Sequence, residues 1–168
     1  MFRQFLSLTL LLTISLCVYG QDMNKGSVET KYKNIYAAVL KILDNGNVDE
    51  LGNYVDKNTV EHDTDYTITT KTGLEGVKDF FRYYHNIFPD MKTTINFVAV
   101  SGDTLLGYIS QTGTTSQPFM GMPAGQKMTM NMVDLIVFKD GKMIEHRGFT
   151  ANTDLMEMMQ HDSMMKKE

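Results

Sequence analysis

The chain has 168 residues, of which 42% are hydrophobic and 21% charged, and its formal net charge at pH 7 is −4. This length suits a single domain and is too short for a β/α barrel of about 250 residues. A negative net charge without a stripe of Lys and Arg argues against nucleic acid as a partner. The single cysteine cannot form a disulfide bond within the chain.

The first 20 residues have the pattern of a secretory signal peptide. Arg3 is followed by an apolar run that ends at Leu16 and is shorter than the ~20 residues a membrane-spanning helix needs. Small residues stand before a cleavage site after Gly20. We therefore expect a secreted or periplasmic protein with one mature domain, residues 21–168, and no membrane span in it. The alternative is a lipoprotein anchored through Cys17, which the bulky residue before it disfavours.

Three helices are predicted in the first half of the chain. Apolar residues recur at three- and four-residue steps from Val28 to Leu43, which is typical of an amphipathic helix. Asn47 and Glu50 have the spacing of a capping box and predict a short second helix. A third helix is expected from Gly76 to Phe88, where Pro89 ends it.

The second half of the chain has the two-residue period of β-strands. A polar, β-branched run from Thr59 to Thr70 predicts a short strand and a loop, and a last helix is expected from Thr153. Between them the pattern predicts four long strands, at residues 93–100, 105–115, 127–139 and 142–150. Helices followed by an antiparallel sheet indicate an α+β fold. If the sheet curves around the three helices, it leaves a cone-shaped cavity suited to a small ligand.

Several segments in this order resemble the SnoaL-like polyketide cyclases, also called ester cyclases, which have the nuclear-transport-factor-2-like fold. They are Asn47–Leu51, Val60–Asp63, Gly76–Phe81, Phe88–Met91, Phe119–Gly125, Val133–Ile136 and Asp140–His146. The resemblance implies ring closure by intramolecular aldol condensation without metal or cofactor. In that reaction a buried carboxylate removes a proton next to a carbonyl and later returns one. The resemblance also leaves a homodimer open.

The chain departs from the family pattern at the key acid. By the resemblance, an aspartate is expected five residues after the Glu-His pair, where this chain has Ala151. Alanine can neither take nor give a proton. Asn152 could donate a hydrogen bond to a carbonyl but is no base, and Asp154 suits the first turn of a helix. This departure favours a catalytically silent binding module as the alternative to an enzyme of the cyclase or isomerase type.

Asp134 and His146 are the best remaining catalytic candidates. Asp134 shares a strand face with Ile136 and Phe138, so it lies either on the solvent face or in the cavity. His146 follows Glu145 on the next strand, where a structural hydrogen-bonded pair is the alternative. If the aspartate and the histidine meet in the cavity, they can act as base and polarising group.

We expect the ligand to be a small apolar molecule that contacts His62, Tyr84, Met120, Met130 and Asn152. For the first two, a loop cap and a core aromatic residue are the respective alternatives. The 14 methionines allow a further hypothesis, a Met-rich copper-binding protein, because thioethers bind Cu(I). The alternation of methionines along the 127–139 strand favours a soft cavity wall instead. No metal and no cofactor are therefore expected.

Overall fold

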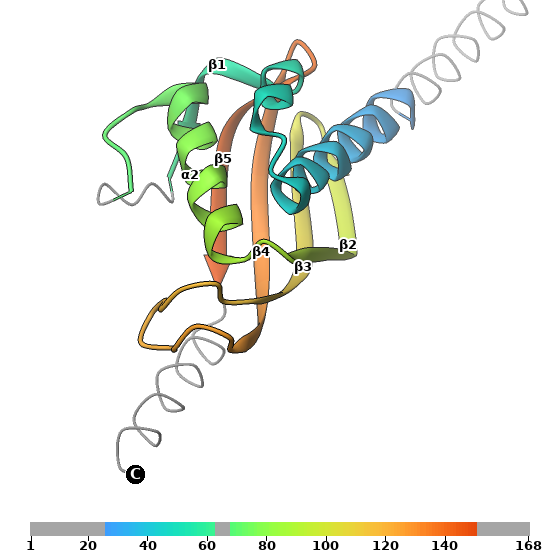
Figure 1. Ribbon diagram of the computed structural model, residues 1–168. Coiled ribbons are helices and arrows are strands. Elements are labelled where there is room, and N and C mark those ends of the chain that lie inside the picture. Colours follow the sequence, from blue (N-terminus) through green and yellow to red (C-terminus); the bar gives the residue numbers. More distant parts are fainter. Residues whose placement is uncertain (1–25, 63–67, 151–168) are drawn as a thin grey trace, which may run out of the picture.

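The computed structural model describes residues 26–62 and 68–150 (Figure 1). Several predicted features lie outside these residues: the signal peptide with its alternative anchor at Cys17, the C-terminal helix, and Ala151, Asn152 and Asp154. Within the two described ranges, no helix is both long enough and apolar enough to span a membrane.

The N-terminal helix is described over residues 26–45 and begins the helical layer of the fold. Its buried side chains recur at three- and four-residue steps, as the sequence predicted, and include Ile35, Val39 and Ile42. The helix ends at Gly46, whose φ of 73° is a left-handed conformation that glycine adopts without a steric penalty.

The second helical segment, η1 (Val48–Asn53), is a 3-10 helix. The predicted capping box was wrong, because the Asn47 side chain makes no capping hydrogen bond. The backbone of Asn47, at φ −80° and ψ 54°, is not the extended backbone of an N-cap. The amide of Glu50 donates to the carbonyl of Asn47 at 3.0 Å, so the tighter 3-10 pattern satisfies the first turn.

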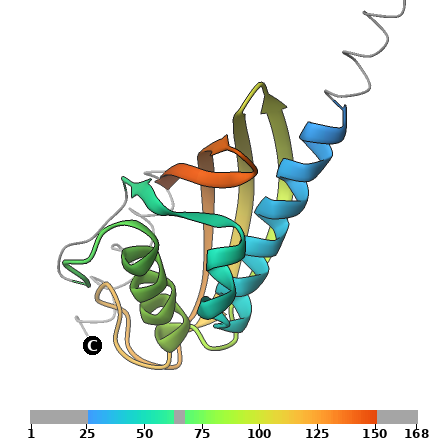
Figure 2. The same cartoon turned by 90° about the horizontal axis from the view of Figure 1, so that it is seen from above.

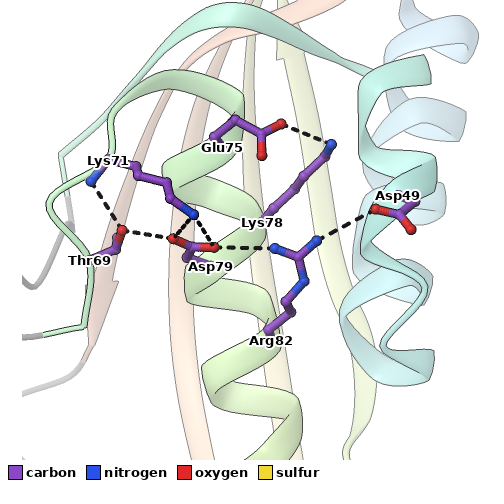
Figure 3. A network of polar contacts seen from close by, with 7 residues as sticks. All are labelled: Asp49, Thr69, Lys71, Glu75, Lys78, Asp79 and Arg82. Atoms are coloured by element: carbon purple, nitrogen blue, oxygen red, sulfur yellow. Dashed lines mark hydrogen bonds and ion pairs between the residues drawn. The ribbon is translucent and has the colours of Figure 1, made fainter.

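The third helix, α2 (Gly73–Ile87), begins before the predicted start and ends before Pro89 as predicted. A polar network on its outer surface holds it in place (Figure 3). Asp79 accepts a hydrogen bond from the Thr69 hydroxyl at 2.9 Å and pairs with Lys71 at 2.9 Å. Arg82 lies 3.2 Å from Asp79 and 3.5 Å from Asp49 of η1. The network therefore joins α2 to η1 and to the segment that leads into α2.

Five strands form one curved sheet: β1 (Val55–Glu61), β2 (Lys92–Ser101), β3 (Thr104–Thr114), β4 (Lys127–Lys139) and β5 (Lys142–Thr150). Their order is β1-β5-β4-β3-β2; β1 runs parallel to β5 and the other neighbours are antiparallel. The sheet contains the four long strands predicted, and its fifth strand, β1, begins before the short strand that was predicted within residues 59–70. β1 is an edge strand in which only Val55 and Thr59 are buried, so its hydrophobic alternation is weak.

The three helical segments cover one face of this sheet, which confirms the α+β architecture (Figures 1 and 2). The ring of Tyr32 on the N-terminal helix stacks on Phe138 of β4, with ring centroids 4.1 Å apart. Inward-facing residues alternate along β3 and β4, as the two-residue period predicted, and Leu105, Ile109 and Ile136 are almost fully buried. The core therefore lies between the helices and the inner face of the sheet.

Candidate functional site

A cavity of about 260 Å³ lies between the helical layer and the inner face of the sheet. Most of its wall is apolar, with side chains from every layer of the fold: Val39, Leu40, Leu43, Val55, Val77, Phe80, Phe81, Ile109, Met120, Met130, Met132, Ile136 and Met143. The polar or amphipathic lining residues are Tyr36, Thr59, Glu61, Tyr84, Gln111, Asp134, His146 and Thr150. A few polar groups in an apolar concave wall are typical of a small-molecule site.

Asp134 lies on the inner face of β4 and lines the cavity. It is only 4% exposed. The hydroxyl of Tyr36, on the N-terminal helix, donates to its Oδ2 at 2.6 Å. The Nε2 of His146, on β5, lies 3.3 Å from its Oδ1. The carboxylate therefore has a hydrogen-bond donor on each oxygen, which offsets much of the cost of burying it.

Two glycines make room for this arrangement. Gly107 on β3 and Gly148 on β5 are the register neighbours of Asp134, so no side chain flanks the carboxylate in its row across the sheet. A Cβ atom on Gly107 would lie 2.5 Å from the Tyr36 hydroxyl oxygen. The tyrosine can reach the carboxylate because that position carries no side chain.

His146 joins Asp134 to a second carboxylate. Its Nδ1 lies 2.9 Å and 2.8 Å from the two carboxylate oxygens of Glu61, which is its register partner on β1. A neutral imidazole has only one N–H group and can donate to only one of the two carboxylates, whereas an imidazolium donates to both. The geometry therefore favours the charged histidine.

The electrostatics of the cluster agree with this protonation state. Burial alone lowers the pKa of His146, but the hydrogen bonds and negative charges of Asp134 and Glu61 outweigh it and raise the pKa to about 10. Burial, followed by the charge and hydrogen bond of Asp134, raises the pKa of Tyr36 well above its ordinary value. At neutral pH both neighbours of Asp134 therefore keep their protons and can donate them in hydrogen bonds.

The structure brings some of the predicted binding residues to the cavity. Tyr84 on α2 and Met130 on β4 are part of its wall. Met120 also lines it but is 50% exposed, because a tight turn with positive φ at Met120 and Gly121 holds it at the surface. His62 does not line the cavity; its Nε2 lies 2.9 Å from Glu145. Asn152 lies outside the described residues.

Two residues of the cluster were missed by the sequence analysis. Tyr36 fits the apolar stripe of the N-terminal helix, so the sequence pattern predicted a core residue and did not indicate a role for its hydroxyl. Glu61 directly precedes His62 in the sequence, and only the histidine was considered as a binding residue. The one available signal was Gly107, a glycine at an inward position of a strand, which often marks the close approach of another group.

Methionines contribute strongly to the apolar wall. Met128, Met130 and Met132 occupy alternate inward positions on β4, and Met128 is buried. Within the described ranges, no group of three or more His, Cys, Asp or Glu residues is arranged to hold a metal ion. In the cavity cluster, both ring nitrogens of His146 already face carboxylate oxygens. The alternative hypothesis of Cu(I) binding by thioethers is not tested by these contacts.

The fold and the site together define an α+β protein of the nuclear-transport-factor-2-like type with a largely apolar cavity. The family model described as SnoaL-like polyketide cyclase matches residues 33–160. The chain therefore belongs to the SnoaL-like polyketide cyclase family, which supports a function in binding a small molecule and in chemistry of the cyclase or isomerase type. No match was found among curated proteins.

Solved structures show the same fold. TsrD from Streptomyces laurentii has 18% identity and a TM-score of 0.68, with 77% of this chain and 95% of that chain covered. Wild-type IdmH from Streptomyces antibioticus has 23% identity and a TM-score of 0.64, with 76% and 97% covered. A SnoaL-like polyketide cyclase from Agrobacterium tumefaciens strain C58 has 20% identity and a TM-score of 0.63, with 76% and 96% covered. At these identities the likeness extends to the fold alone.

Proposed function

We propose that the cavity binds a small, largely apolar carbonyl compound and that Asp134 removes a proton from the carbon next to the carbonyl. The observation that carries this proposal is a carboxylate only 4% exposed on a largely apolar wall. A base positioned in such a site typically contributes about 10²–10⁴-fold to the rate of proton transfer. Family membership supports the same class of chemistry.

The neighbours of Asp134 have separate roles in this proposal. The imidazolium of His146 also lines the cavity, and its positive charge stabilises the negative charge that develops on the substrate oxygen. The hydroxyl of Tyr36 holds the carboxylate in place through the 2.6 Å hydrogen bond. The proton taken by Asp134 is then returned to the product, and the reaction needs no cofactor. The apolar wall supplies orientation by folding the substrate against the base.

Exchange of carbon-bound hydrogen tests the proposal without knowledge of the natural substrate. Acetonaphthone carries a methyl group next to its carbonyl, and in D₂O the loss of the methyl proton signal by NMR reports deprotonation. We expect the wild-type protein to accelerate this loss, and Asp134→Asn to reduce the protein-dependent rate at least about 100-fold. Asp140→Asn is the matched control, because Asp140 lies in an exposed turn at φ 52°, which asparagine tolerates. An unchanged rate in Asp134→Asn would overturn the proposed base.

A catalytically silent binding module is the second candidate, and Ala151 is the observation that favours it. In that case the protein binds acetonaphthone, which fluorescence titration would detect, but does not accelerate the exchange. Binding and exchange measured on the same compound therefore separate the two candidates.

We also propose that the chain is exported, with residues 21–168 as the mature domain. Expression of the whole chain in a bacterial host, followed by mass spectrometry of the periplasmic, membrane and medium fractions, tests this. An N-terminus at Gln21 is expected, and Cys17→Ser should not change it. Recovery of a lipid-modified N-terminus at Cys17 would instead support the lipoprotein. A homodimer, which the resemblance left open, stays a prediction that light scattering can test.

A further inference from the structure

A second polar group lines the cavity at some distance from Asp134. Gln111 lies on the inner face of β3, is only 7% exposed and forms part of the cavity wall. Its register partner on β4 is Met130, four residues from Asp134, so Gln111 and Asp134 lie roughly 13 Å apart along the strands. Ile109 and Met132 occupy the inner positions between them on β3 and β4. Along these two strands the cavity wall therefore has an apolar stretch with a polar side chain at each end.

A chain of hydrogen bonds fixes the orientation of the Gln111 amide. The hydroxyl of Thr93 on β2 donates to Oδ1 of Asp44, on the N-terminal helix, at 2.7 Å, and the Thr93 amide donates to Oδ2 at 3.0 Å. A carboxylate only accepts hydrogen bonds, and a hydroxyl has one proton to donate. The Thr93 hydroxyl oxygen therefore has to accept from its other neighbour, which is Nε2 of Gln111 at 3.3 Å. The nitrogen of the amide is thus turned toward Thr93.

The oxygen of the same amide is available to a ligand. In the described part of the chain, Oε1 of Gln111 has no hydrogen-bond partner, yet it is not fully buried. The accessible space that Gln111 lines is the cavity. An amide oxygen in an apolar wall pairs with an O–H or N–H donor, whereas an ether or a hydrocarbon leaves it without a hydrogen bond.

We propose that Gln111 determines ligand specificity at the end of the cavity away from Asp134, where its Oε1 accepts a hydrogen bond from a hydroxyl or N–H group of the ligand. The inference rests on the proposed binding of a carbonyl compound. It narrows the substrate class to molecules with a carbonyl at one end, an apolar body and a hydrogen-bond donor at the other end. Thr93 is a positioning residue, because it holds the amide and does not line the cavity. A ligand without a donor would leave the amide oxygen desolvated and unpaired.

Three naphthalene ketones test this specificity: 2-acetonaphthone, its 6-hydroxy derivative and its 6-methoxy derivative. At the end of the ring system opposite the carbonyl, the first has only hydrogen, the second has a hydrogen-bond donor, and the third has an oxygen that cannot donate. The chain has no tryptophan, so their fluorescence can be titrated with little interference from the protein. At pH 6 an aryl hydroxyl keeps its proton. We expect the hydroxy ketone to bind at least about fivefold more tightly than acetonaphthone, and the methoxy ketone no more tightly than acetonaphthone.

Variants of Gln111 and Thr93 test whether these residues set the specificity. Gln111→Met keeps the length of the side chain but removes the acceptor oxygen, so the advantage of the hydroxy ketone should disappear. Gln126→Met is the matched control, because Gln126 does not line the cavity and only its backbone forms the described hydrogen bonds. Thr93→Val removes the acceptor that orients the amide and should reduce the advantage at least about twofold. Thr93→Ser keeps the hydroxyl and should preserve the advantage.

The outcomes separate this inference from the proposed function. If acetonaphthone binds but the hydroxy ketone binds no more tightly, or the methoxy ketone shares its advantage, the inference is overturned, while the exchange assay still decides on the base. An advantage that survives in Gln111→Met would also overturn it, because the donor would then pair elsewhere. If no probe binds, the proposed binding function fails and the inference fails with it. Thermal melts check that Gln111→Met is folded. If it is not, the contrast between Thr93→Val and Thr93→Ser decides.

Discussion

Two Glu–His pairs link β5 to the end of β1 and to the residue that follows it, with one pair on each face of the sheet. The dipeptide Glu-His occurs at 61–62 and again at 145–146, and the two copies lie beside each other in the parallel register. Glu61 and His146 meet on the cavity side at 2.8 Å, and Glu145 and His62 meet on the other side at 2.9 Å. The two pairs thus have the same residue types and nearly the same contact distance.

The surroundings of the two pairs are different. In the inner pair, the side chains of Glu61 and His146 are 14% and 25% exposed, and the imidazole has Asp134 as a second partner. In the outer pair, about a third of each side chain is exposed, and Arg147 also approaches Glu145, at 3.3 Å. The comparison teaches that the face of the sheet, and not the dipeptide, decides whether such a pair acts as a buried charge cluster or as a solvated surface contact.

The largest expected difference between the pairs is in their response to pH. Because the pKa of His146 is raised from an ordinary value of 6.5 to about 10, its contribution to stability is complete below pH 6.5 and is lost as pH rises through 10. This contribution is at most ~5 kcal/mol. Urea unfolding across this range should show the wild type losing its advantage over His146→Gln. The matched outer variant, His62→Gln, loses only a partly solvated contact and should differ from the wild type by less than about 1 kcal/mol throughout this range. A constant offset for His146→Gln would contradict the buried-cluster interpretation.

Truncation of each histidine is expected to have the next largest effect. His146→Ala leaves the buried Asp134 and the partly buried Glu61 as two carboxylates without the cation between them, and we expect a loss of about 3 kcal/mol in the free energy of unfolding. His62→Ala removes a partly solvated contact and should cost less than about 1 kcal/mol. Urea denaturation at pH 7 measures both. Equal losses in the free energy of unfolding for the two variants would mean that burial and the second carboxylate do not affect the stability that the histidine contributes.

Much of the sheet could be predicted from the sequence, because apolar residues alternate between the two faces along β3 and much of β4. The observed β4, Lys127–Lys139, has the predicted bounds, and the turn at Asp140 and Gly141 leads into β5 as expected. Because residues two positions apart on a strand lie on the same face, the sequence also allowed Asp134 to lie on the inner face with Ile136. β1 was only partly predicted, because an edge strand with two buried residues carries little hydrophobic pattern.

The partners of Asp134 could not all be predicted. His146 was proposed because the hairpin brings β4 and β5 together locally. Tyr36 is 98 positions away from Asp134, and Glu61 is 85 positions away from His146. No periodicity connects positions so distant, since only packing of the N-terminal helix on β3 and pairing of β1 with β5 bring them together. The outcome for Ala151 lies outside the described residues.

Removal of the Tyr36 hydroxyl takes a hydrogen-bond donor away from Asp134. Its expected effect on stability is smaller than that of truncating His146. Tyr36→Phe leaves Asp134 Oδ2 without its 2.6 Å donor while the ring stays in place, and we expect a cost of about 2 kcal/mol. Tyr32→Phe is the matched control on the same helix, because the stacking of its ring on Phe138 survives the change. Chemical denaturation of both variants checks this. Equal small costs would show that the hydroxyl of Tyr36 adds nothing to the inner cluster.

The smallest expected effect is the salt dependence of the outer pair. A double-mutant cycle on His62 and Glu145 should give a coupling free energy of about 0.5 kcal/mol at pH 6 and low salt, and added salt should reduce it further, because charges at an exposed contact are screened by mobile ions. The matching cycle on His146 and Glu61 should give a larger coupling that salt changes little, since ions cannot enter between buried partners. Both cycles use the same residue types at nearly the same distance, so the comparison tests the surroundings of the two pairs, including the second carboxylate that contacts His146. If the two couplings fall together as salt is added, the inner pair is as solvated as the outer one. The interpretation of Asp134, His146 and Glu61 as a charged cluster shielded from solvent would then be wrong.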